Sequence, residues 1–241
     1  MFKPQVEVFQ VCSFNFSEMV AYFKKGIFMG WTLCLLIIVS TNLTASGQGV
    51  TAEVFAGTSW SLPLPLKIEQ PGEPTIKFRA RYKTKPFTGS PYYAYRVGYN
   101  QWTAELVHHK VYLQNPTSEV EHFEVSHGYN LAMVSRTVPF TQAPSLFRLG
   151  LGLVIGHPEG RIRGKAINPV KSLLGGGYQI SGVCLQAAVG PKLGVAEHWF
   201  FRPEAKLTAA WAKMPLAGGG SVTVPNIAFH TLFGVGYRRH R

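Results

Sequence analysis

Two neighbouring stretches of the chain decide its fold: WTAELVHHKVYL at residues 102–113 and EHFEVSHGYNLAMV at residues 121–134. In both stretches, aromatic and branched residues alternate with small or polar residues over about ten positions. Strands with this alternation and this length are typical of proteins that cross a membrane as a β-barrel. We therefore predict two adjacent membrane strands, Trp102–Leu113 and Glu121–Val134.

Six further segments show the same alternation, and no apolar run beyond residue 50 is long enough for a spanning helix. They are Ala52–Trp60, Tyr92–Tyr99, Leu146–His157, Tyr178–Lys192, Glu197–Trp211 and Asn226–Tyr237. These segments together predict an all-β fold. An even number of strands allows an antiparallel barrel to close with both chain ends on one side. The predicted architecture is an eight-stranded antiparallel transmembrane barrel of the outer-membrane type.

The alternation also assigns the two faces of each strand. In Glu197–Trp211, Arg202, Glu204 and Lys206 share one parity, while Leu207 and Trp211 share the other. A barrel in lipid must place its charges inside. A soluble lipocalin-like barrel would reverse these faces. The leader sequence and the aromatic strand ends favour the membrane form.

The connections between the predicted strands alternate in length. Short links lie at Asn100–Gln101, around Pro139–Pro144 and at Val195–Ala196, whereas residues 61–91, 114–120, 158–177 and 212–225 are mostly longer. Outer-membrane barrels have short turns on the periplasmic side, so we expect both termini there. Residues 76–82 alternate as well and predict a hairpin arm above the membrane.

The first 47 residues have the order of a secretory signal. Lys24 and Lys25 precede the apolar run Gly26–Ser40, which is followed by small and polar residues. We predict cleavage after Gly47, a mature barrel over residues 48–241, and export to the outer membrane. Of the three cysteines only Cys184 would remain, so no internal disulfide is expected.

The charge balance restricts the partners and the chemistry. The formal net charge is +12, with 24 Lys and Arg against 12 acidic residues. All the acids are Glu, which excludes a Ser-His-Asp triad and an Asp-based calcium loop. The basic excess predicts an anionic partner. Because no nucleic-acid-binding motif is present, we expect the headgroups of outer-membrane lipids and no nucleic acid.

The predicted topology brings several polar residues to the outer rim. They are His108, Lys110 and Tyr112 on one strand, Glu124, Ser126 and His127 on the next, and His157 at the end of a third. We predict that His108, Lys110, Glu124 and Ser126 face the lumen. His127 and His157 would join them only if a bulge at Gly128 or Gly156 shifts the alternation. His109, His122, His198 and His230 are interpreted as interface or surface residues.

These residues are compatible with more than one chemistry. His108 and Glu124, with His127 or His157, could hold a divalent transition metal with an open position for oxygen or water. Ser126 activated by a histidine, with Glu124 orienting it, could attack an ester. Alternatively, charged lumen residues merely fill a narrow barrel with ion pairs.

We expect the barrel to be a monomer.

Four stretches carry a resemblance to a known family. PYYAYRVGY (91–99), WTAELVHHKVYL (102–113), HFEVSHGYN (122–130) and GLGLVIGH (150–157) resemble the outer-membrane barrels that include lipid A oxidase. The matching positions are His108, Lys110, Glu124, His127, Gly128 and Asn130. The resemblance implies an eight-stranded barrel that oxidises the proximal glucosamine of lipid A with molecular oxygen.

These observations give one functional hypothesis and two alternatives. The barrel is expected to act on, or bind, the lipid A of lipopolysaccharide. The expected catalytic residues are Glu124, Ser126 and His127, and the expected metal ligands are His108, Glu124 and His157. The expected lipid A contacts are Arg96, Lys110, Tyr112, Asn130 and Arg202. The alternatives are an esterase similar to lipid A deacylase and a structural or adhesive barrel.

Overall fold

A computed structural model of the chain describes residues 49–89, 91–138, 146–170 and 177–240. The predicted signal segment 1–47 lies outside these residues. Within them, no helix is long and apolar enough to cross a membrane. The strands are β1 (Gly49–Ser61), β2 (Leu64–Glu69), β3 (Ile76–Ala80), β4 (Tyr82–Lys83), β5 (Tyr93–Tyr99), β6 (Trp102–Leu113), β7 (Val120–Val138), β8 (Leu146–Gly156), β9 (Glu159–Ile162), β10 (Lys165–Ile167), β11 (Gln179–Gly190), β12 (Leu193–Gly194), β13 (Trp199–Pro215) and β14 (Ser221–His240).

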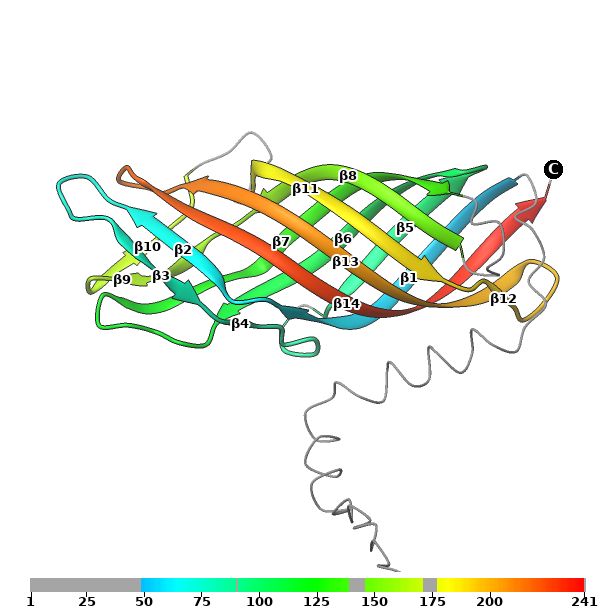
Figure 1. Cartoon of the computed structure of the whole chain (residues 1–241), viewed down its shortest axis with the longest axis horizontal. Coiled ribbons are helices and arrows are strands. Elements are labelled where there is room, and N and C mark those ends of the chain that lie inside the picture. The colour runs from blue at the N-terminus through cyan, green and yellow to red at the C-terminus, as the bar shows by residue number, and fades with distance from the viewer. Residues whose placement is uncertain (1–48, 90, 139–145, 171–176, 241) are drawn as a thin grey trace, which may run out of the picture. The chain divides into compact units, whose positions relative to one another are not determined.

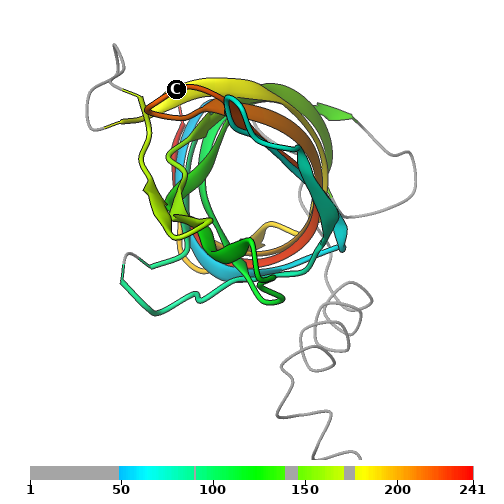
Figure 2. The ribbon, with the colours of Figure 1, turned by 90° about the vertical axis from the view of Figure 1, so that its left-hand side faces the viewer.

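Eight of these strands form a closed antiparallel ring (Figures 1 and 2). The order is β6, β7, β8, β11, β13, β14, β1 and β5, and pairing between β5 and β6 closes the ring. The eight predicted strands are therefore confirmed. β7 and β14 extend beyond their predicted bounds. The predicted hairpin arm corresponds to β3, which pairs with β2, and to β4, which pairs with β6.

The links between ring strands are short at the end that holds both termini. Gly49 pairs with His240 there, and Asn100–Gln101 joins β5 to β6 at the same end. At the opposite end, β2, β3, β9 and β10 extend the sheet beyond the ring. Because outer-membrane barrels keep short turns in the periplasm, the end opposite the termini is the external end.

The outer surface of the ring is apolar. Val97, Leu151, Val183 and Leu185 each expose between 58% and 67% of their surface, and Leu149 and Leu153 lie on the same face. Arg202, Glu204 and Lys206 on β13 are buried in the lumen. The predicted faces of these strands are confirmed. A soluble lipocalin-like barrel would show the reverse arrangement, so that alternative is wrong.

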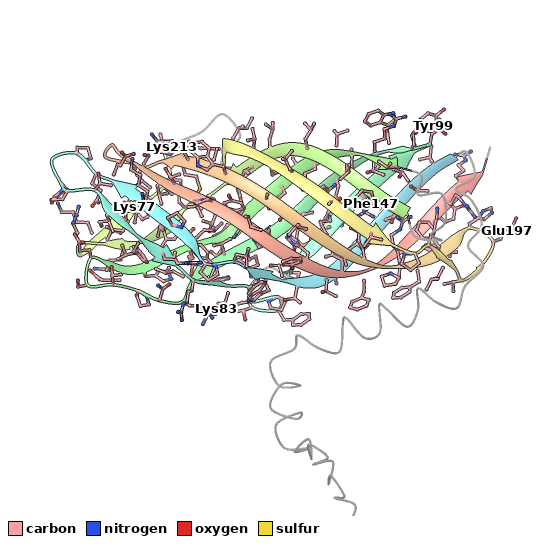
Figure 3. The ribbon with its side chains drawn as sticks, viewed as in Figure 1. Lys77, Lys83, Tyr99, Phe147, Glu197 and Lys213 are labelled. Atoms are coloured by element: carbon pink, nitrogen blue, oxygen red, sulfur yellow. The ribbon has the colours of Figure 1, made fainter. Side chains whose placement is uncertain are left out.

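Aromatic residues lie near both ends of this apolar surface, as they do in membrane barrels. Tyr99, Trp102, Trp199 and Tyr237 are exposed at the end of the termini, and Trp60 and Trp211 are exposed toward the other end. Charged side chains extend further out, with Glu197 at the first end and Lys77 and Lys213 at the second (Figure 3). The chain is a transmembrane β-barrel of the outer-membrane type.

A network of charged side chains fills the lumen. The Arg96 guanidinium lies 3.2 Å from Glu53, 3.0 Å from Glu105 and 2.8 Å from Glu204. The other ion pairs of the network join Arg148 to Glu204, Arg202 to Glu53, and Lys206 to Glu105. All these side chains are 5% exposed or less, so the predicted filling of the barrel by ion pairs is confirmed.

A layer of uncharged polar groups also lies inside the barrel. His109 Nε2 is 3.1 Å from Asn226 Oδ1, and its Nδ1 is 3.2 Å from Ser59 Oγ. His230 bonds to Thr208 through Nε2 at 2.7 Å and to Tyr92 through Nδ1. Both histidines are almost fully buried. Their interpretation as surface or interface residues is therefore wrong.

Candidate functional site

The outward face of the barrel changes from apolar to polar at one level on three adjacent strands. Toward the external end, Leu106 is followed on its face by His108 on β6, and Ile155 of β8 is followed by His157 immediately after the strand ends. On β7, between them, Ala132 gives way to Asn130. The register aligns these changes, because His108 pairs with Asn130 and Asn130 pairs with Ile155. A polar patch thus begins where the apolar belt ends.

His108 lies on the outward face and is covered by neighbouring side chains. Its ring stacks on Tyr93 with centroids 4.9 Å apart, and its Nδ1 lies 2.8 Å from Asn130 Oδ1. Pairing between β5, β6 and β7 is continuous from Trp102 to His109, so the alternation from lumenal Glu105 places His109 inside and His108 outside. The prediction that His108 faces the lumen is wrong.

Lys110 and Tyr112 continue the same outward face beyond His108. The Lys110 ammonium donates to the backbone carbonyls of Thr88, at 2.5 Å, and of Lys85, at 3.3 Å. It also lies 5.4 Å from the centre of the Tyr112 ring. The segment before β5 therefore covers these two side chains. The predicted lumenal position of Lys110 is wrong as well.

A bulge in β7 interrupts the alternation at Ser126–Gly128. His109 pairs with Tyr129 and Val111 with Val125, so Lys110 alone lies opposite these three residues. Gly128 has a φ of 127°, and a Cβ at this position would lie 2.2 Å from the Asn130 side chain. Glycine is needed at this position because a larger residue would have to adopt this disfavoured φ and would also clash with the Asn130 side chain. A bulge thus lies at Gly128, one of the two positions at which the sequence would allow it.

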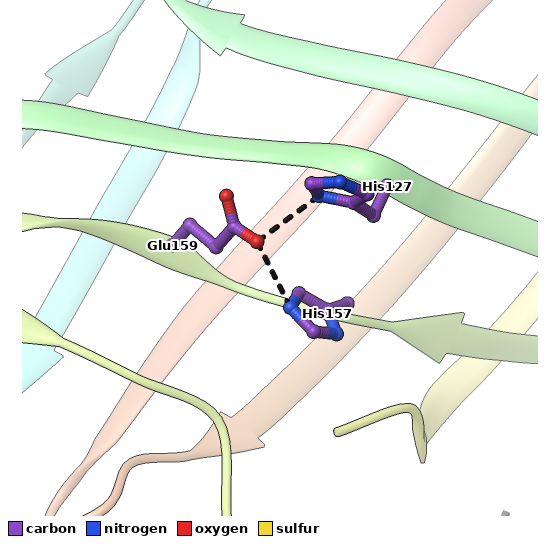
Figure 4. Close-up of side chains that lie close together, drawn as sticks. All are labelled: His127, His157 and Glu159. Carbon is purple, nitrogen blue, oxygen red and sulfur yellow. Dashed lines mark ion pairs between the residues drawn. The ribbon is translucent and has the colours of Figure 1, made fainter. Parts of the chain in front are cut away.

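The bulge brings His127 beside His157 and a third residue, Glu159 (Figure 4). His127 Nδ1 and His157 Nε2 each lie 3.0 Å from the same carboxylate oxygen, Glu159 Oε1. The two imidazole rings have their centroids 5.4 Å apart. We refer to these three residues as the histidine cluster. Its facing donor atoms all lie within 4.8 Å of one another.

Local structure explains how the histidine cluster forms. His157 and Glu159 are two positions apart at the end of β8 and the start of β9, a spacing that places side chains on the same side of an extended chain. The Tyr178 hydroxyl donates to the backbone carbonyl of His127 at 2.9 Å, and its ring lies 5.2 Å from that of His157. The cluster is thus held from β7, β8, β9 and the start of β11.

An open pocket of about 770 Å³ adjoins the histidine cluster. His157 and Glu159 form part of its wall. Glu121, His122, Arg161 and Asn168 also line it. The Arg161 side chain is 57% exposed, so the pocket offers a solvated cation beside the cluster.

The structure separates some residues that the sequence analysis had grouped. Glu124 accepts a hydrogen bond from His122 at 2.9 Å, and His108 is bonded to Asn130. Of the predicted metal set of His108, Glu124 and His157, only His157 belongs to the histidine cluster. Glu159 was missed, although its spacing of two from His157 was a usable signal.

Arg96 and Arg202 lie inside the barrel, away from any lipid. Their side chains are buried and paired with Glu53, Glu105 and Glu204. The strand alternation already assigns Arg202 to the lumen, and a closed lumen filled with side chains leaves no access for lipid A. The predicted lipid contacts of both arginines are therefore wrong.

Ser126 does not form a nucleophile relay with the residues around it. Its Oγ lies 3.4 Å from His127 Nδ1, the same ring nitrogen that faces Glu159. A Ser-His-acid relay requires the serine and the acid on opposite nitrogens of the ring. The predicted orienting acid, Glu124, is bonded to His122 instead. The described geometry therefore disfavours the esterase alternative.

No protein-family model matches the chain, and no curated protein matches it. The chain is similar to several solved outer-membrane proteins. The outer membrane protein OprG from Pseudomonas aeruginosa has 12% sequence identity and a TM-score of 0.47, over 83% of this chain and 100% of that one. Outer Membrane Protein W from E. coli has 12% identity and a TM-score of 0.40, over 81% and 100%. Similarity at this level carries no information on function.

Proposed function

We propose that this barrel binds and modifies the lipid A part of lipopolysaccharide from its outward face, at the level of the outer leaflet. One observation carries the proposal. The polar patch of His108, Asn130 and the histidine cluster lies on the lipid side of the wall, where the apolar belt ends at the external end. A membrane barrel exposes polar groups on this face only at the level of the headgroups.

The position of the patch suits a lipid substrate. Acyl chains would lie along the apolar surface formed by Leu106, Leu153 and their neighbours. The sugar headgroup of the same molecule would then be level with the histidines, and its phosphates would meet cations such as Arg161. A lipid moving in the leaflet would reach this patch without leaving the membrane.

The proposed reaction is oxidation of the proximal glucosamine of lipid A, at an anomeric carbon that carries a free hydroxyl, to an aminogluconate. Molecular oxygen accepts the two electrons and is reduced to hydrogen peroxide, and water supplies the added oxygen atom. The choice of oxidation rests on a resemblance to barrels that include lipid A oxidase. The resemblance is carried by residues 91–99, 102–113, 122–130 and 150–157. Hydrolysis of an ester is the weaker candidate because Ser126 and Glu159 face the same nitrogen of His127. The resemblance and the outward position of the patch support the same substrate.

Mass spectrometry of lipid A from an aerobic Gram-negative host that expresses the chain tests this function. We expect a species heavier by one oxygen atom, and we expect His157→Ala to abolish it. His198→Ala is the matched control because His198 lies at the opposite end of the barrel, beside Tyr237. Unchanged lipid A with a folded barrel in the outer membrane would contradict the proposal. Loss of an acyl chain would select the esterase instead.

A further inference from the structure

We propose that the histidine cluster of His127, His157 and Glu159 binds one divalent transition-metal ion, with open coordination positions toward the adjoining pocket. This inference does not require lipid A to be the substrate, because it rests on the donor atoms of the three residues and on their geometry. It assigns a ligand set that differs from the predicted one by including His127 and Glu159.

The donor chemistry favours a transition metal. Imidazole nitrogen is a preferred ligand of zinc, iron, nickel and copper, whereas calcium and magnesium prefer oxygen ligands alone. Two imidazoles and one carboxylate hold catalytic zinc in some hydrolases and non-haem iron in some oxygenases, with further positions left for water or substrate. The cluster offers this donor set in one place.

The distances between donor atoms are close to those of a coordinated ion. With metal–ligand bonds of about 2.0–2.1 Å and tetrahedral angles, adjacent ligand atoms lie about 3.3 Å apart. Glu159 Oε1 lies 3.0 Å from a nitrogen of each histidine. The two histidine nitrogens lie within 4.8 Å of each other. An ion would therefore draw the two imidazoles closer together by rotation of their side chains.

The cluster is also accessible and supported. The side chain of His127 is 58% exposed and that of Glu159 33%, so an ion can reach the site from outside. His157 is only 15% exposed and lies against the Tyr178 ring, which limits its rotation. The Gly128 bulge and the Tyr178 hydroxyl fix the backbone of His127. Ligands held in this way lose less freedom when a metal binds.

The open side of the site faces a space large enough for a second ligand. His157 and Glu159 belong to the wall of the pocket of about 770 Å³, together with Arg161 and Asn168. Three protein ligands leave at least one coordination position for water or an anionic group. Arg161 would assist an anion at that position by charge.

Metal content of the purified barrel tests the inference. The full chain is expressed with an affinity tag that lacks histidine, folded in detergent and treated with a chelator. It is then incubated with Zn²⁺ or Co²⁺ and separated from unbound metal by gel filtration. We expect about one ion per chain, and a visible Co²⁺ spectrum of four or five coordination.

Three variants and a control give the test its specificity. His127→Ala, His157→Ala and Glu159→Gln should each lower the affinity by roughly tenfold or more. His122→Ala should retain it, because His122 lies beside the same pocket and is paired with Glu124. Heat-dependent migration on gels checks that each variant is folded.

Two results would overturn the inference. One is the absence of stoichiometric metal from the folded wild-type barrel, and the other is unchanged binding by a His127→Ala/His157→Ala double variant. Metal binding and lipid A modification are measured separately. A metallated barrel that leaves lipid A unchanged would therefore contradict the proposed function and support the metal site.

Discussion

Two groups of polar side chains lie on opposite sides of the same barrel wall. Inside, Arg96, Glu105 and Glu204 are fully enclosed and neutralise one another. Outside, His127 and Glu159 remain partly exposed and border a pocket. Ionisable residues therefore have different roles on the inner and outer faces of the barrel wall. The inner group holds the barrel together, whereas the outer group is accessible to an ion or a lipid.

The contrast follows from the cost of burying charge. A charge removed from water requires a partner, and losing that partner leaves an uncompensated charge in the interior. Among the described residues, the ion-pair network of the lumen joins four cations, Arg96, Arg148, Arg202 and Lys206, and three carboxylates, Glu53, Glu105 and Glu204. Each member constrains the others. The outer group has solvent as an alternative partner, so its residues can be changed at smaller cost in stability.

The largest expected effect comes from removing one carboxylate of the lumen. Glu204 lies 2.8 Å from Arg96, 2.5 Å from Arg148 and 3.6 Å from Lys206. Glu204→Gln leaves these cations undercompensated, and we expect the free energy of unfolding to fall by about 3–5 kcal/mol. Denaturant unfolding of the barrel in lipid vesicles, followed by tryptophan fluorescence, measures this change.

The matched control for that change is Glu121→Gln at the external rim. Glu121 lies 3.9 Å from Arg161, and both side chains are largely solvated. An exposed pair of this kind contributes about 0–1 kcal/mol, so the unfolding curve should hardly move. If both variants were equally stable, the inner network would have no special structural role.

A smaller effect is expected from the adjacent histidines His108 and His109. His109→Leu would leave Asn226 Oδ1 without its partner inside the barrel, whereas Ser59 would keep its hydrogen bond to Thr84. The expected loss is about 1–3 kcal/mol in the same unfolding measurement, since an unsatisfied buried polar group costs that much. His108→Leu should lower the free energy of unfolding by less, because the contacts of His108 with Tyr93 and Asn130 lie on the outward side of the barrel. The reverse order would show that the two faces have been assigned wrongly.

The ring of eight strands was predictable from the sequence because alternation over ten residues is a strong signal for membrane strands. The faces of β8 and β13 were predictable for the same reason. On β8 the leucines of residues 149–153 alternate with glycines, and on β13 the charged residues of the segment 202–206 alternate with uncharged ones. On β6 the prediction failed. It assumed that polar residues face inward along the whole strand, whereas His108 and Lys110 lie beyond the end of the apolar belt.

The candidate site was only partly predictable. The sequence indicated that His127 and His157 would approach the same rim, and its glycines allowed a bulge at Gly128 or at Gly156. It did not reveal the pairing of β9 with β7, which places Glu159 beside both histidines. Pairing of short strands outside the membrane depends on tertiary contacts, and four-residue segments carry little alternation from which to infer it.

A change in metal affinity, in addition to a change in stability, is expected for Gly128→Ala. A Cβ at Gly128 would lie 2.2–2.4 Å from the Asn130 side chain, and the φ of 127° disfavours any other residue. We expect a loss of roughly 1–3 kcal/mol in stability. Relaxation of the bulge would move His127 away from Glu159, so Zn²⁺ affinity should fall roughly 10–100-fold.

Gly164→Ala separates the backbone effect from the effect on the site. Gly164 also has a positive φ, 72°, but a Cβ there would meet nothing within 4 Å, and it lies in the turn between β9 and β10. Its stability cost should be similar, whereas its Zn²⁺ affinity should equal that of the wild type. Equal affinities for all three proteins would mean that the bulge does not position His127. The position of the outer group would then be set by the backbone of His157 and Glu159 alone. The outer group would differ even more from the inner network, in which each member constrains the others.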